Sequence, residues 1–188
     1  GTRAWILARP LSGFAETFSQ YIVEVSSGGG SDRPELDPGA EGVLFVVEGH
    51  MHLTIEGEAH RLDPGGYAFL PPGCDFTVHN ESPLPLRFHW IRKLYQPAPG
   101  IAAPAPFVTN EQQTPIRWMP DTGDRWGTTR FVEPDDLRHD AHVNIVTFVR
   151  FQVTTDVGAI ITLVGCQLIG LPKPFAAIQL LWITIIMD

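Results

Sequence analysis

The sequence has few cysteines and few positive charges. Its 188 residues include two cysteines, Cys74 and Cys166, which lie far apart. Two distant cysteines make neither a CxxC motif nor a disulfide framework, so they do not indicate a redox compartment. Lys and Arg number 13 against 21 Asp and Glu, which gives a formal net charge of −8. Because neutralising phosphates requires clustered Lys and Arg, we expect no nucleic-acid partner.

Targeting signals and several enzyme motifs are also lacking. The first residue is Gly1, and no charged-then-apolar signal segment follows it. We therefore expect a processed or fragmentary chain, with the cytoplasm favoured and the compartment otherwise open. The sequence contains no P-loop, dinucleotide fingerprint or nucleophile elbow, so it gives no sign of the enzyme classes that depend on them.

The last 38 residues, 151–188, carry only three charged side chains: Asp156, Lys173 and Asp188. The uncharged run from Val157 to Leu171 has 15 residues, fewer than the roughly 20 that a membrane helix needs. We expect buried strand-like material or a tail that is not native to the fold, such as a splice variant or a frame change. A membrane anchor within 157–187 is the alternative.

Glycine and proline are abundant, with 18 and 17 residues, too many for a helical bundle. Short apolar or alternating segments are separated by turns such as Asp63-Pro64-Gly65-Gly66. This spacing is typical of a β-sandwich or barrel. We expect a strand from about Trp5 and strands at residues 17–25, 43–47, 50–56, 59–62, 67–70, 76–79 and 86–94. Four prolines in the eleven residues 96–106 indicate an extended connector.

Two glycine-rich stretches resemble the paired signature of the cupin superfamily. The second signature, G-x5-P-x-G-x2-H-x3-N, is matched from Gly65 to Asn80, with Phe76 in place of the histidine. The first, G-x5-H-x-H-x4-E-x6-G, keeps its spacing from Gly29 to Gly49, but Glu35, Asp37 and Gly42 stand at the ligand positions. The resemblance implies an all-β cupin jelly-roll barrel that has lost its metal ligands.

A closer resemblance is to the (S)-ureidoglycine aminohydrolases, which are bicupins whose first barrel lacks metal ligands. It covers roughly residues 4–149, and its segments are residues 18–25, 41–49, 66–73, 91–95 and 142–148. It implies a cupin barrel at 1–95, a Pro-rich linker and loop at 96–141, and the start of a second cupin at 142–188 that runs into the atypical apolar tail. The fold expected is an incomplete bicupin.

The resemblance also implies the chemistry of the complete enzyme. In that family a Glu, two His and a Gln in the second barrel hold Mn²⁺, and hydrolysis of a non-peptide C–N bond in the ureide releases ammonia and leaves ureidoglycolate during purine (allantoin) catabolism. This sequence has no His after His142 and no Glu after Glu133. We therefore assign no catalytic, cofactor-binding or metal-binding residue, expect no bound Mn²⁺, and expect the chain to be inactive alone. Homo-oligomers are expected from the family.

Two alternatives are open. One is a metal-free cupin that binds a small ligand or regulates a partner. The other is a different metal-dependent cupin in which Glu35, Asp37 and a histidine converge.

Several further polar residues invite a functional interpretation. His50 and His52 share a strand face, but solvent-facing histidines explain them, and the same holds for His79 and His89 unless they converge. Arg87, Arg92 and Lys93 are interpreted as a solvated strand edge, and Cys74 as an inert thiol. A hydrophilic loop accounts for the cluster of Asp135, Asp136, His139, Asp140 and His142.

Overall fold

The computed structural model describes residues 1–9, 18–121, 123, 127–133, 135–139 and 143–149. The apolar tail at 151–188, His142 and Asp140 lie outside these residues. The chain divides into two compact units, and the barrel belongs to the unit formed by residues 1–116 and 129–147. In the part that the structure describes, no helix has the length and apolar character that crossing a membrane requires.

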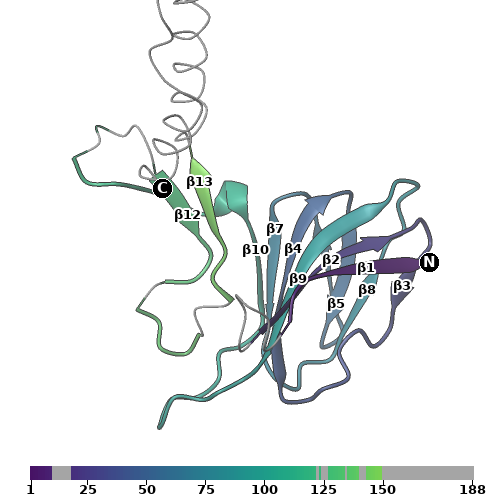
Figure 1. The fold of residues 1–188 in the computed structure, drawn as a ribbon, viewed down its shortest axis with the longest axis horizontal. Helices are drawn as coiled ribbons and strands as arrows, with labels where there is room; N and C mark the ends of the chain where they lie inside the picture. Colours follow the sequence, from purple (N-terminus) through teal and green to yellow (C-terminus); the bar gives the residue numbers. More distant parts are fainter. Residues whose placement is uncertain (10–17, 122, 124–126, 134, 140–142, 150–188) are drawn as a thin grey trace, which may run out of the picture. The chain divides into compact units, whose positions relative to one another are not determined.

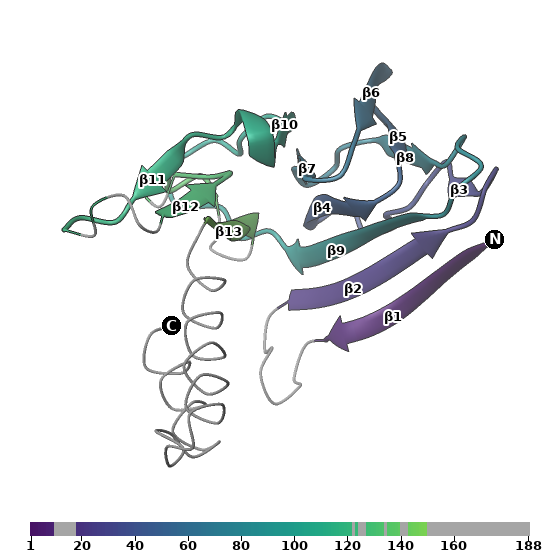
Figure 2. The same cartoon turned by 90° about the horizontal axis from the view of Figure 1, so that it is seen from above.

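The barrel is made of two antiparallel sheets (Figures 1 and 2). The six-stranded sheet has the order β1-β2-β9-β4-β7-β10, and its strands are β1 (Thr2–Ala8), β2 (Phe18–Val25), β9 (Leu86–Leu94), β4 (Ala40–Glu48), β7 (Gly66–Leu70) and β10 (Phe107–Asn110). The four-stranded sheet has the order β3-β8-β5-β6, and its strands are β3 (Gly30–Ser31), β8 (Phe76–His79), β5 (Met51–Ile55) and β6 (Glu58–Leu62). These strands confirm the all-β barrel and the strand positions expected from the sequence.

The remaining elements are short. The 3₁₀ helix η1 (Glu111–Gln113) begins at Asn110, whose side chain accepts a hydrogen bond from the Gln112 amide. Strands β11 (Ile116–Trp118), β12 (Gly127–Arg130) and β13 (Val146–Val149) belong to neither barrel sheet. Within the segment 142–148, which the resemblance places at the start of a second cupin, the strand β13 begins at Val146.

The segment after residue 95 is not all connector. Residues Phe107–Asn110 form β10 and pair antiparallel with β7, so that they extend the barrel sheet by one strand. The prolines that exclude regular structure end at Pro106, immediately before β10. Proline composition located the irregular stretch but not the strand that follows it.

The barrel core lies between the two sheets. Alternate residues of β5, namely Met51, Leu53 and Ile55, point inward and are buried, and Leu44 and Val46 of β4 join the same cluster. A half-buried strand places every second side chain in the core, which is the alternation seen in the sequence.

Signature residues that are not ligands shape the turns. Gly49 has a φ of +82°, and a Cβ there would lie 2.5 Å from the Pro85 carbonyl oxygen, so only glycine fits. Asn80 is fully buried; its amide donates to the carbonyls of Val25 and Leu84 at 2.9 and 2.8 Å, and its Oδ1 accepts from the Ser82 amide. These positions maintain the barrel independently of any metal.

Candidate functional site

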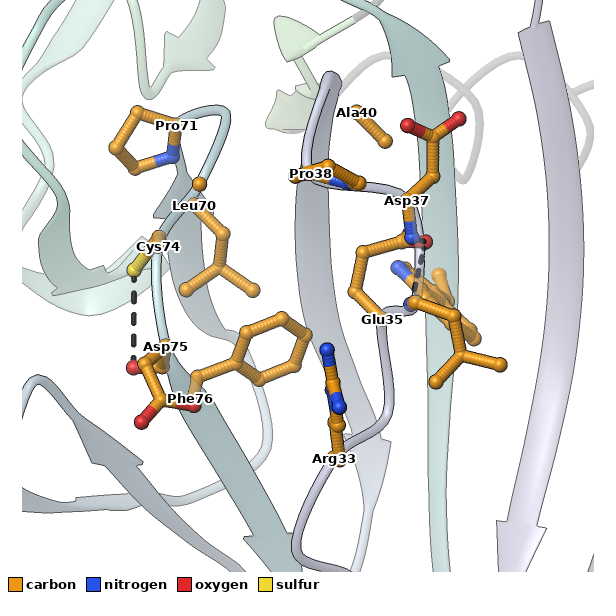
Figure 3. A pocket seen from close by; sticks show the side chains of 14 residues that line it. Arg33, Glu35, Asp37, Pro38, Ala40, Leu70, Pro71, Cys74, Asp75 and Phe76 are labelled. Carbon is orange, nitrogen blue, oxygen red and sulfur yellow. Dashed lines mark hydrogen bonds between the residues drawn. The ribbon is translucent and has the colours of Figure 1, made fainter.

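The four substituted ligand positions meet at one end of the barrel. Glu35, Asp37, Gly42 and Phe76 all line an open cavity of about 480 Å³ (Figure 3). Glu35 and Asp37 come from the loop before β4, Gly42 from β4 and Phe76 from β8. The two signatures, far apart in sequence, therefore converge as in a cupin barrel, and the residues that they bring together determine what this cavity can do.

The carboxylate of Glu35 forms an ion pair with the guanidinium of Arg92. Nε of Arg92 donates to Oε2 of Glu35 and Nη2 to Oε1, both at 2.6 Å, and Oε1 also accepts from the backbone amides of Leu36 and Asp37. Hydrogen bonding to Glu35 raises the pKa of the Arg92 guanidinium, against the opposing effect of burial. A bidentate, charge-assisted pair of this kind leaves the carboxylate neutralised by the protein itself.

Aromatic side chains occupy the space beside Gly42. A Cβ at Gly42 would lie 3.3 Å from Nε1 of Trp90, and Phe76 is 5% exposed. The Arg92 guanidinium carbon lies 5.8 Å from the centre of the Trp90 ring, within range of a cation–π interaction. Because neither glycine nor phenylalanine can donate electrons to a metal, the inner wall of the cavity is apolar where a cupin ligand would stand.

Asp37 stabilises the turn that leads into β4. Its Oδ1 accepts a hydrogen bond from the Gly39 amide at 2.9 Å, and its carbonyl accepts from Ala40. Among the described residues, no group of three or more His, Cys, Asp and Glu side chains is placed to hold a metal ion. The side chains at the four positions therefore do not fit a cupin metal, and in the described part of the chain no histidine joins Glu35 and Asp37 there.

Cys74 borders the same cavity and is half-buried (Figure 3). Burial, with smaller effects from the carboxylates of Glu56 and Asp75, raises the pKa of its thiol to about 11. Because the thiolate is the reactive form, the raised pKa makes this cysteine a weak nucleophile near neutral pH, in agreement with the expectation from the sequence.

Among the described residues, no histidine lines the cavity. Four pair with acidic residues: His50 with Asp63 at 2.6 Å, His79 with Asp32 at 2.9 Å, His52 with Glu81 at 3.5 Å, and His139 with Asp136 at 3.6 Å. His89 on β9 is half-buried, and burial lowers its pKa. His139 lies edge-on to Phe69 and Phe107, where burial again lowers its pKa.

The basic residues of β9 do not form one patch, because successive residues of a strand face opposite sides. Arg92 points into the barrel mouth, whereas Lys93 is buried on the other face. Arg87 pairs with Glu24 at 2.9 Å and with Glu48 at 3.1 Å near the surface. The expectation of a single solvated edge therefore holds for Arg87 and is wrong for Arg92 and Lys93.

A second apolar cluster on the outer face of the six-stranded sheet was not foreseen. Tyr67 and Phe69 of β7 pack there with Val43, Val132 and Val143, and Tyr67 stacks on Phe131 at 4.5 Å between ring centres. The Tyr67 hydroxyl donates to the Val143 carbonyl at 2.6 Å. The continuous apolar runs of β4 and β7 were the available signal, since a strand covered on both faces does not alternate.

Comparisons with known proteins agree with this architecture. The cupin domain family matches residues 21–92. A solved structure described as a glyoxylate-induced protein from Pseudomonas aeruginosa is 61% identical, with a TM-score of 0.72 over 77% of this chain and 54% of that one. The protein Ylba of E. coli is 26% identical, with a TM-score of 0.63 over 74% of this chain and 52% of its own.

Among curated proteins, the (S)-ureidoglycine aminohydrolase of Escherichia coli is 30% identical over 99 residues, which are 53% of this chain and 37% of that protein. This chain thus spans about half the length of these two solved proteins and less of the aminohydrolase. Another match, of 45 residues at 47% identity, is to the human calcium-transporting ATPase type 2C member 1 and covers 5% of it. So short a part carries no activity over to this chain. Residues 21–92, with their converging signatures and two-sheet barrel, form a cupin domain, and this barrel belongs to the cupin superfamily.

Proposed function

We propose that this barrel is the non-catalytic amino-terminal half of a two-barrel hydrolase of the (S)-ureidoglycine aminohydrolase type. In the complete enzyme, a manganese ion in the second barrel would support hydrolytic release of ammonia from the ureide. The 30% identity to the E. coli aminohydrolase supports the assignment to this family. The described residues would contribute stability and an interface, with no catalytic group.

The ion pair between Glu35 and Arg92 carries the proposal. A carboxylate that already accepts four hydrogen bonds, three of them at Oε1, and is neutralised by a guanidinium is a poor ligand for a cation. Arg92 itself brings a permanent positive charge to the place where a cation would bind. The barrel would therefore retain the cupin shape while an internal ion pair stands in for the metal.

The outer cluster supports a packing role. Tyr67, Phe69 and Val43 are fully buried although they face away from the barrel interior, because side chains that include Phe131, Val132 and Val143 pack over them. A barrel with apolar side chains on both faces of one sheet is suited to association with a neighbouring domain. In the bicupin family that neighbour is the second barrel, and the same contacts would support oligomers.

The test is metal content combined with ammonia release. The purified full chain is incubated with Mn²⁺, freed of unbound metal, and assayed for manganese and for ammonia formed from freshly prepared (S)-ureidoglycine, with the E. coli enzyme as the positive control. We expect neither stoichiometric manganese nor ammonia above the uncatalysed rate. Stoichiometric manganese with turnover would overturn the proposal, because side chains that we regard as structural would then carry the chemistry.

A second function is favoured by the open cavity of about 480 Å³ at the barrel mouth, which exceeds the volume of a single water many times over. In a metal-free binding module, a small polar ligand would enter beside Arg33 and Asp75 (Figure 3). Calorimetry with small ureides and carboxylates distinguishes the two. Saturable binding that Arg33→Ala and Phe76→Ala weaken would favour the module, and no binding would favour the non-catalytic half.

A further inference from the structure

Two histidines face each other on the outer surface of the four-stranded sheet. In the register of β5 and β8, His52 lies directly opposite His79, and Thr54 opposite Thr77. The intervening residues Leu53 and Val78 are buried in the core. Because side chains alternate along a strand, both imidazoles project from the opposite, solvent-facing side.

Their placement brings the two rings within reach of one ion. Directly opposed residues in an antiparallel pair have Cβ atoms about 4.5–5.5 Å apart. The side chains of His52 and His79 are 40% and 39% exposed, respectively, so solvent reaches both. A metal–nitrogen distance of about 2.0–2.1 Å allows an ion to be shared by two imidazoles whose Cβ atoms are this close.

A carboxylate beside His52 determines which of its two ring nitrogens is available to a metal ion. Nδ1 of His52 lies 3.5 Å from Oε2 of Glu81, which leaves Nε2 of His52 directed away from that carboxylate. A carboxylate on one imidazole nitrogen favours the tautomer whose other nitrogen has a free lone pair, an arrangement common behind metal ligands. Glu81 is therefore placed to act as a positioning residue for His52.

His79 also presents Nε2. Its Nδ1 lies against Gly30, where any side chain would collide with the ring, so this nitrogen is covered by the backbone of β3. Nε2 lies 2.9 Å from Oδ1 of Asp32, whose side chain is 91% exposed and can turn away. An ion at Nε2 of His79 must therefore displace the hydrogen bond to Asp32, and metal ligation by histidine requires the deprotonated nitrogen.

The charges around the pair are compatible with a cation. On the edge of β5 away from β8, His52 pairs with Arg61 of β6. The Nε of Arg61 lies 3.2 Å from Oδ1 of Asp63, so the Asp63 carboxylate balances the charge of Arg61. Asp63 also binds His50 and thereby holds that ring at the end of β6. Asp32 and Glu81 add two negative charges on the β8 side.

We propose that His52 and His79 bind one divalent transition-metal ion through their Nε2 atoms, with water completing its coordination. Imidazole nitrogens favour Cu²⁺, Ni²⁺ and Zn²⁺, and the expected order of affinity places Cu²⁺ first and Mn²⁺ last. This site lies on the outer face of the sheet and is separate from the barrel cavity. It neither requires nor restores the cupin metal.

Titration calorimetry of the full chain with Zn²⁺ and Ni²⁺ near pH 7.5 tests the proposal. His52→Gln and His79→Gln should each weaken binding by roughly tenfold or more, and Glu81→Gln by a smaller factor. The matched control is His60→Gln: His60 lies opposite Leu53 and so faces the other side of the sheet.

A second measurement does not depend on folding of the variants. In the wild-type chain, Zn²⁺ should protect His52 and His79, but not His60, from carbethoxylation as detected by peptide mass spectrometry. Equal binding by wild type and both single variants would overturn the proposal. So would an equally large loss in His60→Gln or His50→Gln, or Mn²⁺ binding as tight as that of Ni²⁺.

Discussion

The guanidinium of Arg92 is clamped to the carboxylate of Glu35 by two hydrogen bonds of 2.6 Å. Their side chains are 28% and 14% exposed, respectively, so the pair is largely withdrawn from solvent. Glu35 stands where the cupin signature has its first histidine, and Arg92 faces Gly42, which replaces the glutamate. The ion pair thus links Glu35, which stands at one altered ligand position, to the strand partner of Gly42, which stands at another.

Removing the cation alone should destabilise the barrel. Arg92→Met leaves the Glu35 carboxylate buried and uncompensated, and we expect the free energy of unfolding to fall by about 2–3 kcal/mol. Urea denaturation measures the change. The double variant Glu35→Gln/Arg92→Met keeps the acceptor for the Leu36 and Asp37 amides and should recover most of the loss. If the double variant were as unstable as Arg92→Met, the cost would come from lost packing on Trp90.

Truncating Asn80 should destabilise the barrel strongly, because its side chain makes three hydrogen bonds within the protein. Asn80→Ala leaves the carbonyls of Val25 and Leu84 and the Ser82 amide without their partner inside the protein, so unfolding should become easier by about 2–3 kcal/mol. Asn110→Ala is the control, because Asn110 caps η1 near the surface and should cost about 1 kcal/mol. Equal midpoints in urea for the two variants would contradict this account.

Tyr67 should make the barrel sensitive to alkali. Burial, and secondarily the Glu41 carboxylate, raises the pKa of the Tyr67 phenol far above its ordinary value of 10.0. The folded protein then holds a proton that the unfolded chain loses, so the stabilisation is complete below pH 10 and decreases as the pH rises beyond it. In Tyr67→Phe, the decrease between about pH 10 and 12 should be smaller, as measured by urea midpoints across that range.

The same substitution also removes the hydrogen bond to Val143, so at pH 7 Tyr67→Phe should be less stable than wild type by about 1 kcal/mol. In ultraviolet titration of the folded wild type, the Tyr67 phenol should stay un-ionised up to about pH 12. Three normal titrations below pH 12 would contradict the burial of the Tyr67 phenol.

Cys74 should react slowly with alkylating reagents. With a thiol pKa of about 11, the rate of iodoacetamide labelling in a Cys166→Ser background should keep rising with pH up to that value. The same protein in urea should show the midpoint of an ordinary thiol, near 8.5 to 9. Coincident midpoints for folded and unfolded protein would show that the thiol is not shielded.

Local chemistry in the sequence determined the strands, the turns and the cupin class. Alternation over Met51, Leu53 and Ile55 specifies a half-buried strand whatever it pairs with, and Gly49 is required by backbone conformation. The spacing from Gly65 to Asn80 indicated the barrel and, through Phe76, the loss of a ligand. These inferences depend on residues close together in the chain.

Only the tertiary structure decided which side chains meet. Glu35 and Arg92 are 57 residues apart, and their contact depends on the register of β4 against β9. The same holds for the contact of Trp90 with Gly42, for the pairing of His52 with His79, and for the hydrogen bond from Tyr67 to Val143. Shifting a strand register by one residue would turn each of these side chains to the other face. The sequence therefore determined the barrel and its missing ligands, whereas strand register decided what occupies the vacated positions.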